Sequence, residues 1–292
     1  MGHRSGFVNI LGNPNVGKST IMNALVGERL SIITPKVQTT RHRILGILNG
    51  DGFQAVFSDT PGILMPKYLL QEKMMEFVDT ALTDADVIVY VTDVTERLEK
   101  GGDYLLKIKN SPVPKLIAIN KIDLTDQPGL EKLAEEWRTA FPGSEIIPLS
   151  ATNSFNVKGL LDAIVDKLPE GEPFFPEDQL TDRFERFFVS EIIREKILLN
   201  YEKEIPYSVE VEVESFIEEE KIDRIRAVIY AERDSQKGIL IGHRGAMLKK
   251  TGTDARIAIE DFLGKKVFLE LYVKVNREWR QKPNMLKKFG YR

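Results

Sequence analysis

The sequence of 292 residues contains no cysteine and only three histidines. The lack of cysteine excludes disulfide bonds, thiolate metal sites and thiol catalysis. No apolar run approaches the ~18 residues that a membrane span needs, and residues 1–11 are too short for a signal sequence with a cleavage site. We therefore expect a protein of the cytoplasm.

The chain also lacks a large excess of charge of either sign, because its net charge is −3. The average hides an asymmetry, since residues 237–292 hold 14 Lys and Arg against 5 Asp and Glu. A local excess of positive charge favours contact with nucleic acid at this end of the chain. At ~100–200 residues per domain, the length predicts two domains.

Short apolar runs alternate with helical patterns in the first half of the chain. This order predicts an α/β domain at residues 1–170, with a mostly parallel six-stranded sheet and helices on both faces. The turn sequence N-G-D-G at residues 49–52 predicts a hairpin, so one strand should run antiparallel. Three prolines within residues 169–176 predict an interdomain linker, which we place at residues 171–180.

A different order follows in residues 181–292, which we take as the second domain. The pattern predicts a helix at 181–200, strands at 209–213 and 225–231, glycine-rich helical turns, a helix at 246–263 and a strand at 267–275. The result is an α+β domain of order α-β-β-α-α-β, followed by a basic tail. We expect the Glu-rich stretch 210–220 to be a solvated strand face and turn.

Residues 12–19 read G-N-P-N-V-G-K-S and lie between an expected strand and an expected helix, as a phosphate-binding loop requires. Backbone N–H groups of such a loop surround phosphates, while Lys18 reaches the β and γ oxygens and the Ser19 hydroxyl completes a Mg²⁺ shell. The residues expected to contact the nucleotide here are Gly12, Asn13, Asn15, Val16, Gly17, Lys18, Ser19 and Thr20.

The loop alone does not distinguish GTP from ATP, but residues 120–123 read N-K-I-D and resemble the guanine-binding pattern N-K-x-D. The Asp123 carboxylate would accept hydrogen bonds from guanine N1–H and the 2-amino group, which adenine does not present. We expect Asn120 to hold the base edge, Lys121 to lie over the ring, and Ser150-Ala151 to place the Ala151 N–H at the 6-oxo group.

Two further segments are predicted to sense the γ-phosphate. In the D-T-P-G sequence at 59–62, Asp59 can hold Mg²⁺ through a water and the Gly62 N–H can bond the phosphate. Within residues 31–43, Thr40, rather than Thr39, would close on Mg²⁺.

The residue after the D-T-P-G turn bears on hydrolysis. Ras-like enzymes have Gln at this position to orient the attacking water, but this chain has Ile63, whose aliphatic side chain cannot do so. We expect slow hydrolysis that depends on Lys18, Thr40, Gly62 and an external charge, which Asn15 could supply by binding K⁺.

The second domain carries G-H-R-G at 242–245 between helical segments, the arrangement of a KH domain that binds unstacked nucleotides. A catalytic or metal-binding role for His243 is disfavoured because no carboxylate cluster is near it in the sequence. Basic and aromatic residues of the tail (274–292) suit stacking on bases; a frayed tail is the alternative. The expected RNA contacts are Ile239, Ile241, Gly242, His243, Arg244, Gly245, Lys249, Lys250, Trp279 and Arg280.

Taken together, these motifs resemble the Era family of bacterial GTPases over nearly the whole chain. The resemblance also rests on Q-T-T-R-H-R-I, P-E-D-Q-L-T-D-R and V-K-V-N-R-E-W-R. It implies a type II KH domain, GTP hydrolysis, binding to the 3′ end of small-subunit ribosomal RNA, maturation of the small ribosomal subunit, and peripheral association with the inner face of the cell membrane. The chain departs from the family at Phe184 and Thr152, where Pro and Leu are usual. We expect a monomer.

Three interpretations stay open at this point. The first is a switch in which GTP orders the segments around Thr40 and Asp59 and so changes RNA affinity. The second is a constitutive RNA-binding protein with an inactive nucleotide site. The third is a nucleotide kinase or an ATPase, which Asn120 and Asp123 disfavour. Transfer RNA is the alternative to ribosomal RNA as a partner.

Overall fold

The structure is a computed structural model that describes residues 2–98 and 102–291. The chain divides into two compact units, unit 1 (Met1–Pro66 and Met74–Asp182) and unit 2 (Lys67–Lys73 and Arg183–Arg292), and each is described by itself. Within the described residues, no helix is both long enough and apolar enough to cross a membrane.

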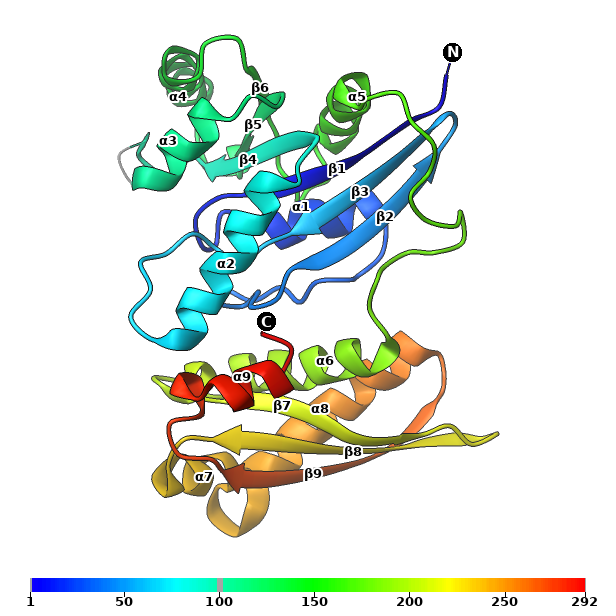
Figure 1. The fold of residues 1–292 in the computed structure, drawn as a ribbon. Coiled ribbons are helices and arrows are strands. Elements are labelled where there is room, and N and C mark those ends of the chain that lie inside the picture. Colours follow the sequence, from blue (N-terminus) through cyan, green and yellow to red (C-terminus); the bar gives the residue numbers. More distant parts are fainter. Residues whose placement is uncertain (1, 99–101, 292) are drawn as a thin grey trace. The chain divides into compact units, whose positions relative to one another are not determined.

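Unit 1 contains a six-stranded sheet of order β2-β3-β1-β4-β5-β6 (Figure 1). All neighbours are parallel except β2 and β3, which form the predicted antiparallel hairpin. The strands are β1 (Arg4–Leu11), β2 (Ile44–Gly50), β3 (Phe53–Asp59), β4 (Val87–Asp93), β5 (Lys115–Asn120) and β6 (Glu145–Pro148). The predicted fold class of the first domain is confirmed.

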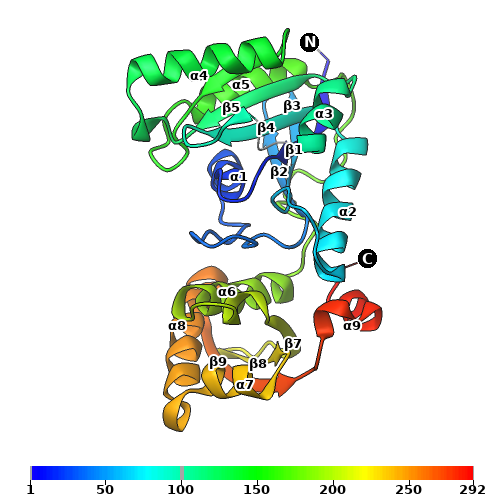
Figure 2. The same ribbon diagram turned by 90° about the vertical axis from the view of Figure 1, so that its left-hand side faces the viewer.

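Helices cover both faces of this sheet, which explains why the central strands are apolar runs without alternation: every residue of β4 is buried. Helices α1 and α5 pack against each other, and Figure 2 shows α2 and α3 across the sheet from α1. The helices are α1 (Lys18–Val26), α2 (Leu69–Thr83), α3 (Gly102–Asn110), α4 (Gln127–Ala140) and α5 (Val157–Lys167).

The segment predicted as a linker is attached to unit 1 by hydrogen bonds. Gln54 on β3 accepts from the backbone N–H groups of Phe174 and Phe175 at 2.7 and 3.0 Å. At the far end of the segment, Thr181 donates its hydroxyl to the Leu45 carbonyl at 2.7 Å. The following helix begins at Glu185 rather than at the predicted residue 181, because Phe184, which precedes it, has an extended backbone (φ −82°, ψ 157°).

Unit 2 has the predicted α-β-β-α-α-β order, with a three-stranded sheet β7-β8-β9. Strands β7 and β8 are antiparallel, whereas β8 and β9 are parallel. One core joins α6 and α8 to the inner sheet face, and the short α9 lies on the other side of the sheet from α8 (Figure 2). The elements are α6 (Glu185–Asn200), β7 (Glu210–Ile217), β8 (Ile222–Ala231), α7 (Asp234–Ile241), α8 (Ala246–Leu263), β9 (Lys266–Val275) and α9 (Pro283–Lys288).

The C-terminal tail is folded, so the prediction that its aromatic residues stack on bases is wrong for Trp279 and Tyr291. The Trp279 side chain is fully buried and its indole N–H donates to the Ser208 carbonyl at 2.9 Å. Tyr291 is also buried, and its hydroxyl donates to Glu210 at 2.8 Å. Glu210 is therefore enclosed, contrary to the solvated face predicted for 210–220. Arg292 lies outside the described residues.

Candidate functional site

The loop at residues 12–19 connects β1 to α1, and packing against neighbouring strands explains its glycines. A Cβ on Gly12 would lie 2.2 Å from the Val91 carbonyl oxygen, and one on Gly17 would lie 2.1 Å from Asn120 Nδ2. Both glycines also have positive φ, as does Asn15 at 65°. The loop therefore lies directly against the carboxyl ends of β4 and β5.

Lys18, the first residue of α1, is held inside this loop. Its Nζ donates to the carbonyl oxygens of Gly12 and Asn13 at 3.0 and 2.8 Å. Burial lowers the pKa of Lys18 to about 8, although Asp59 opposes the shift. An ammonium has three N–H donors, so Lys18 keeps one for a phosphate oxygen.

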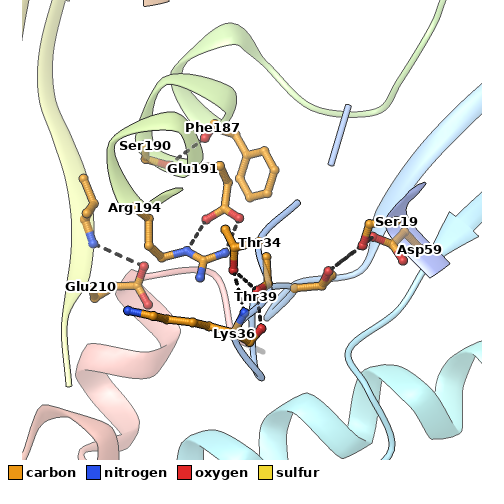
Figure 3. Close-up of polar contacts among 12 residues, drawn as sticks. Ser19, Thr34, Lys36, Thr39, Asp59, Phe187, Ser190, Glu191, Arg194 and Glu210 are labelled. Carbon is orange, nitrogen blue, oxygen red and sulfur yellow. Dashed lines mark hydrogen bonds and ion pairs between the residues drawn. The ribbon is translucent and has the colours of Figure 1, made fainter. Parts of the chain in front are cut away.

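Three oxygen-bearing side chains converge beside Lys18. Ser19 Oγ donates to Asp59 Oδ2 at 2.7 Å, and Figure 3 shows these two side chains together. Ser19 Oγ also lies 2.9 Å from Thr40 Oγ1, which itself donates to Asp59 Oδ2 at 3.3 Å. Among the described residues, Asp59 Oδ1 is buried without a hydrogen-bond partner, and burial raises the pKa of this carboxyl. A buried oxygen-only set with an orphaned carboxylate oxygen fits Mg²⁺.

The structure places Thr40, and not Thr39, at this cluster. Thr39 Oγ1 instead donates to the Lys36 carbonyl at 2.6 Å and lies 2.7 Å from Thr34 Oγ1, which stabilises the segment internally (Figure 3). On the other side of the loop, a Cβ on Gly62 would lie 2.7 Å from Pro14 Cα. The Ile63 side chain is buried and its N–H donates to the Gly12 carbonyl at 3.1 Å.

The N-K-x-D segment begins at Asn120, the last residue of β5. Asn120 contacts other parts of the protein, which differs from the predicted contact with the base edge. Asn120 is buried; its Nδ2 donates to the Val16 carbonyl at 2.9 Å and its Oδ1 accepts from the Ala151 N–H at 3.0 Å. The Ala151 N–H predicted for the 6-oxo group is thus engaged by Asn120, which links three loops. The Ser150 hydroxyl donates to Asp123 Oδ1 at 2.6 Å and orients that carboxylate.

Lys121 has a left-handed backbone (φ 60°, ψ 35°) and its side chain runs back to the phosphate-binding loop. Its Nζ donates to the Asn15 carbonyl at 2.7 Å and forms an ion pair of 2.5 Å with Asp93 Oδ2. Asp93 was missed by the sequence analysis because it belongs to no motif. The available signal was its place as the charged residue that ends the apolar run of β4.

These segments surround a cavity of about 550 Å³. Six residues that were predicted to bind the nucleotide or its metal do not line the cavity: Gly12, Asn13, Val16, Asp59, Ser150 and Ala151. The cavity is also lined by residues for which no role was predicted, among them Ile32, Ile33, Pro35, Gln38, Leu124 and Thr152. The complete lining is Pro14, Asn15, Gly17, Lys18, Ser19, Thr20, Ile32, Ile33, Thr34, Pro35, Gln38, Thr39, Thr40, Gly62, Asn120, Lys121, Asp123, Leu124 and Thr152.

In unit 2 the G-H-R-G loop joins α7 to α8 with three residues at positive φ: Gly242 (72°), Arg244 (50°) and Gly245 (79°). His243 and Arg244 are exposed, and a Cβ on Gly245 would meet nothing within 4 Å. Before the loop, Ile239 is half exposed and Ile241 packs against the core. The loop therefore presents open backbone at Gly245, whereas a Cβ on Gly242 would lie 2.7 Å from Met247 Cγ.

A groove of about 380 Å³ begins at this loop and runs between α8 and β9. Its lining consists of Gly245, Leu248, Lys249, Gly252, Thr253, Arg256, Leu269 and Leu271. The α8 members recur at helical spacing, so they form one stripe. Arg256 was missed, although its spacing of seven residues from Lys249 places it on the same helix face.

Two basic residues predicted to contact RNA have partners in the protein. Lys250 forms an ion pair with Asp254 at 2.8 Å and does not line the groove. Arg280 pairs with Glu232. Other cations of the tail are also neutralised: Lys274 pairs with Glu214 at 2.7 Å and Lys288 pairs with Glu212 at 2.6 Å. Much of the positive charge of the tail is therefore compensated within unit 2.

Comparison with known proteins identifies both units. Residues 7–121 match the family described as "50S ribosome-binding GTPase", and residues 204–280 match the KH domain family. The curated GTPase Era of Staphylococcus haemolyticus is 44% identical over 292 residues, which covers 99% of this chain and 97% of that protein.

Two solved structures are similar over 99% of both chains. One is a single-residue variant of Aquifex aeolicus Era bound to GDP and AlF4−, at 40% identity and a TM-score of 0.94. The other is Era in complex with MgGDPNP and nucleotides 1506–1542 of 16S ribosomal RNA, at 39% identity and a TM-score of 0.95.

Proposed function

Because the chain belongs to the Era family of GTPases, we propose that the cavity of unit 1 binds GTP and GDP and that the groove of unit 2 binds the 3′ end of small-subunit ribosomal RNA. One observation carries the nucleotide assignment: Asp123 and the loop at 12–19 line the same cavity. The RNA assignment is supported by the similar Era structure that contains nucleotides of 16S ribosomal RNA.

Guanine selectivity follows from the Asp123 carboxylate. Ser150 fixes Oδ1, and the carboxylate then accepts from guanine N1–H and the 2-amino group. Adenine would leave the carboxylate without those donors, a penalty that can reach ~10⁴ in specificity. The stem of Lys121 lies along one face of the base. This geometry favours a GTPase over an ATPase or a nucleotide kinase.

At the phosphate end, Lys18 and the N–H groups of the loop bind the β and γ oxygens, while Gly62 N–H contacts the γ-phosphate. Ser19, Thr40 and Asp59 would hold Mg²⁺, which neutralises charge on the phosphates. Ile63 is buried and cannot orient a water. Asn15 Nδ2 donates to the Pro35 carbonyl at 3.0 Å, so its Oδ1 is the oxygen available to a K⁺ ion.

Ordering of residues 34–40 and of the turn at Asp59 by the γ-phosphate makes the RNA affinity of the protein depend on the bound nucleotide. Hydrolysis then releases the RNA and permits one round of action during maturation of the small subunit. We assign the protein to the cytoplasm as a monomer, with peripheral association at the inner face of the cell membrane.

In unit 2 the open backbone at Gly245 admits the sugar-phosphate chain, and the apolar wall of Leu248, Leu269 and Leu271 receives unstacked bases. Lys249 and Arg256 line this groove and are placed to neutralise phosphates, although Arg256 also pairs with Glu260 at 2.8 Å, which offsets part of its charge. Trp279 is excluded from contact with bases by its burial. The groove suits about four nucleotides of single strand.

A base-swap experiment tests the nucleotide site. In Asp123→Asn, the amide can donate to the 2-oxo group of xanthine, so we expect GDP affinity to fall at least a hundredfold and xanthosine diphosphate to bind more tightly than GDP. Asp126→Asn is the matched control, because Asp126 caps α4 three residues later and Asn caps equally well. Unchanged GDP binding by Asp123→Asn would remove the guanine assignment.

The partner is tested by cross-linking GTP-loaded protein in cell extract and sequencing the attached RNA. Fragments from the 3′ end of small-subunit ribosomal RNA are expected, whereas transfer RNA would redirect the assignment. Equal RNA affinity with a GTP analogue and with GDP would contradict the switch.

A further inference from the structure

We infer that Asp93 is a positioning residue of the nucleotide site, which fixes the Lys121 side chain against the base and thereby slows nucleotide release. The inference rests on the proposed nucleotide site and adds to it a residue that belongs to none of the sequence motifs. Asp93 ends β4 and pairs in register with Asn120, the last residue of β5, so Lys121 is the first residue after the adjacent strand.

The orientation of the Asp93 carboxylate is fixed by the turn that follows it. Oδ1 accepts two hydrogen bonds from Thr95, one from the backbone N–H at 2.8 Å and one from Oγ1 at 2.6 Å. Oδ2 is thereby directed to Lys121 Nζ, at 2.5 Å. The Asp93 side chain is 4% exposed and the Lys121 side chain is 33% exposed, so the ion pair is shielded from solvent on the carboxylate side only.

The charge state of Asp93 is also defined. Burial raises the pKa of Asp93, but the hydrogen bonds from Lys121 and Thr95 outweigh burial and hold this pKa below its ordinary value. Asp93 is therefore ionised at neutral pH and holds the Lys121 ammonium, whose second partner is the Asn15 carbonyl.

Geometry links the pair to the cavity. Lys121 lines the cavity, whereas Asp93 lies outside its lining. The ammonium is held at two points, at Asp93 and at Asn15, so the methylene stem between the backbone and Nζ has little rotamer freedom left to lose when a base packs on it. Asp93 thus contributes to nucleotide affinity without touching the nucleotide.

Asp93→Asn tests the inference directly, because it preserves the size of the side chain and replaces the acceptor that faces Lys121 Nζ with a donor. Thr95 supplies two donors, so the amide oxygen must stay at the Oδ1 position, and the amide nitrogen then faces the Lys121 ammonium, donor against donor. We expect Asp93→Asn to release fluorescent GDP about tenfold faster in stopped flow, with an unchanged association rate. Single-turnover hydrolysis of bound GTP should change less than GDP release does, because Asp93 contacts the base-binding lysine and reaches the phosphate-binding loop only through that side chain.

A double-mutant cycle separates positioning from general stability. Lys121→Met keeps the stem and removes the ammonium, so Asp93→Asn should have no further effect on release in that background. Thr95→Val keeps the backbone N–H and removes Oγ1, and should accelerate release about threefold. Asp162→Asn is the control, since Asp162 pairs with Lys158 on the exposed face of α5, and should leave release unchanged.

The outcomes divide clearly. Release from Asp93→Asn within twofold of wild type, or the same acceleration in the presence and absence of Lys121→Met, overturns the inference. If Asp93→Asn fails to fold, Thr95→Val decides by the same criterion. A wild-type protein that does not bind GDP would overturn the site assignment and this inference with it, whereas tight wild-type binding with unaltered variants overturns this inference alone.

Discussion

The two glycine loops of this protein each end in a glycine that precedes a helix, Gly17 before α1 and Gly245 before α8, and these two glycines have opposite surroundings. In the loop at 12–19, the space that a side chain on Gly12 or Gly17 would fill is already occupied by Val91 and Asn120. In the loop at 242–245, the corresponding space at Gly245 is open. Gly242 resembles the glycines of unit 1, because a Cβ there would lie 2.7 Å from Met247 Cγ. Gly245 is instead favoured by its positive φ alone, and its open side leaves room for a ligand.

The largest expected effect concerns Trp279, which the structure places in the interior of unit 2. Trp279→Ala removes a fully buried side chain, so we expect a loss of ~3–5 kcal/mol in the free energy of unfolding of unit 2. RNA affinity at a temperature where the variant is folded should stay within twofold of wild type. Hydrogen exchange of the β7–β9 amides measures the destabilisation, with Trp137→Ala, which is buried in unit 1, as the control. Selective loss of RNA affinity would restore the stacking prediction.

Next in size is Gly17→Ala. The new Cβ would displace Asn120, which holds Val16 and Ala151, so we expect GDP affinity to fall about a hundredfold, equivalent to ~2.7 kcal/mol. Gly27→Ala, at the other end of α1, also has positive φ but meets nothing within 4 Å; it should cost ~1 kcal/mol of stability and leave Kd unchanged. Equal effects of both changes on Kd would contradict the role of packing.

In unit 2 the matched change is Gly245→Ala, where the methyl group enters open space at the head of the groove. The folded structure should persist with ~1 kcal/mol of strain from the positive φ, while the affinity for a labelled RNA of the 3′-terminal small-subunit sequence falls about tenfold. Gly238→Ala, in α7, also meets nothing and should leave RNA affinity unaltered. Tight RNA binding by Gly245→Ala would show that the backbone is not approached there.

The smallest effect is expected at Gly252, in the middle of α8. Its Cβ would lie 3.3 Å from Leu271 Cδ1 on the wall of the groove, so Gly252→Ala should weaken RNA binding about threefold. The same change should stabilise the helix by ~0.5–1 kcal/mol. Fluorescence anisotropy and thermal melting measure the two quantities, and a variant that is both more stable and tighter in RNA binding would disprove the assigned groove.

The sequence predicted the fold of both units because its strongest patterns are local. The apolar runs of β4 and β5 and the helical period of α8 each specify an element without knowledge of the rest of the chain. The motifs at 12–19 and 120–123 predicted the cavity because each reaches it from the carboxyl end of a strand.

What the sequence did not predict depends on contacts between distant residues. Trp279 and the basic residues around it have the composition of a stacking surface, and only the partner Ser208, which lies 71 residues away, shows that the indole is enclosed. Asp93 has no motif around it, and its relation to Lys121 arises from the pairing of β4 with β5. The docking of residues 171–181 likewise requires Gln54 and Leu45 on the sheet.

Asn15 has a consequence for the kinetics of exchange. Its backbone carbonyl accepts a hydrogen bond from Lys121 Nζ of the base-binding segment. Its side-chain amide Nδ2 donates to the Pro35 carbonyl, in the segment that closes over the phosphates. One residue, through its backbone carbonyl and its side-chain amide, thus connects the segments that would hold the two ends of a nucleotide, and a partner protein that rotated this residue would loosen both ends at once. A protein that catalyses nucleotide exchange would then need to contact little more than Asn15.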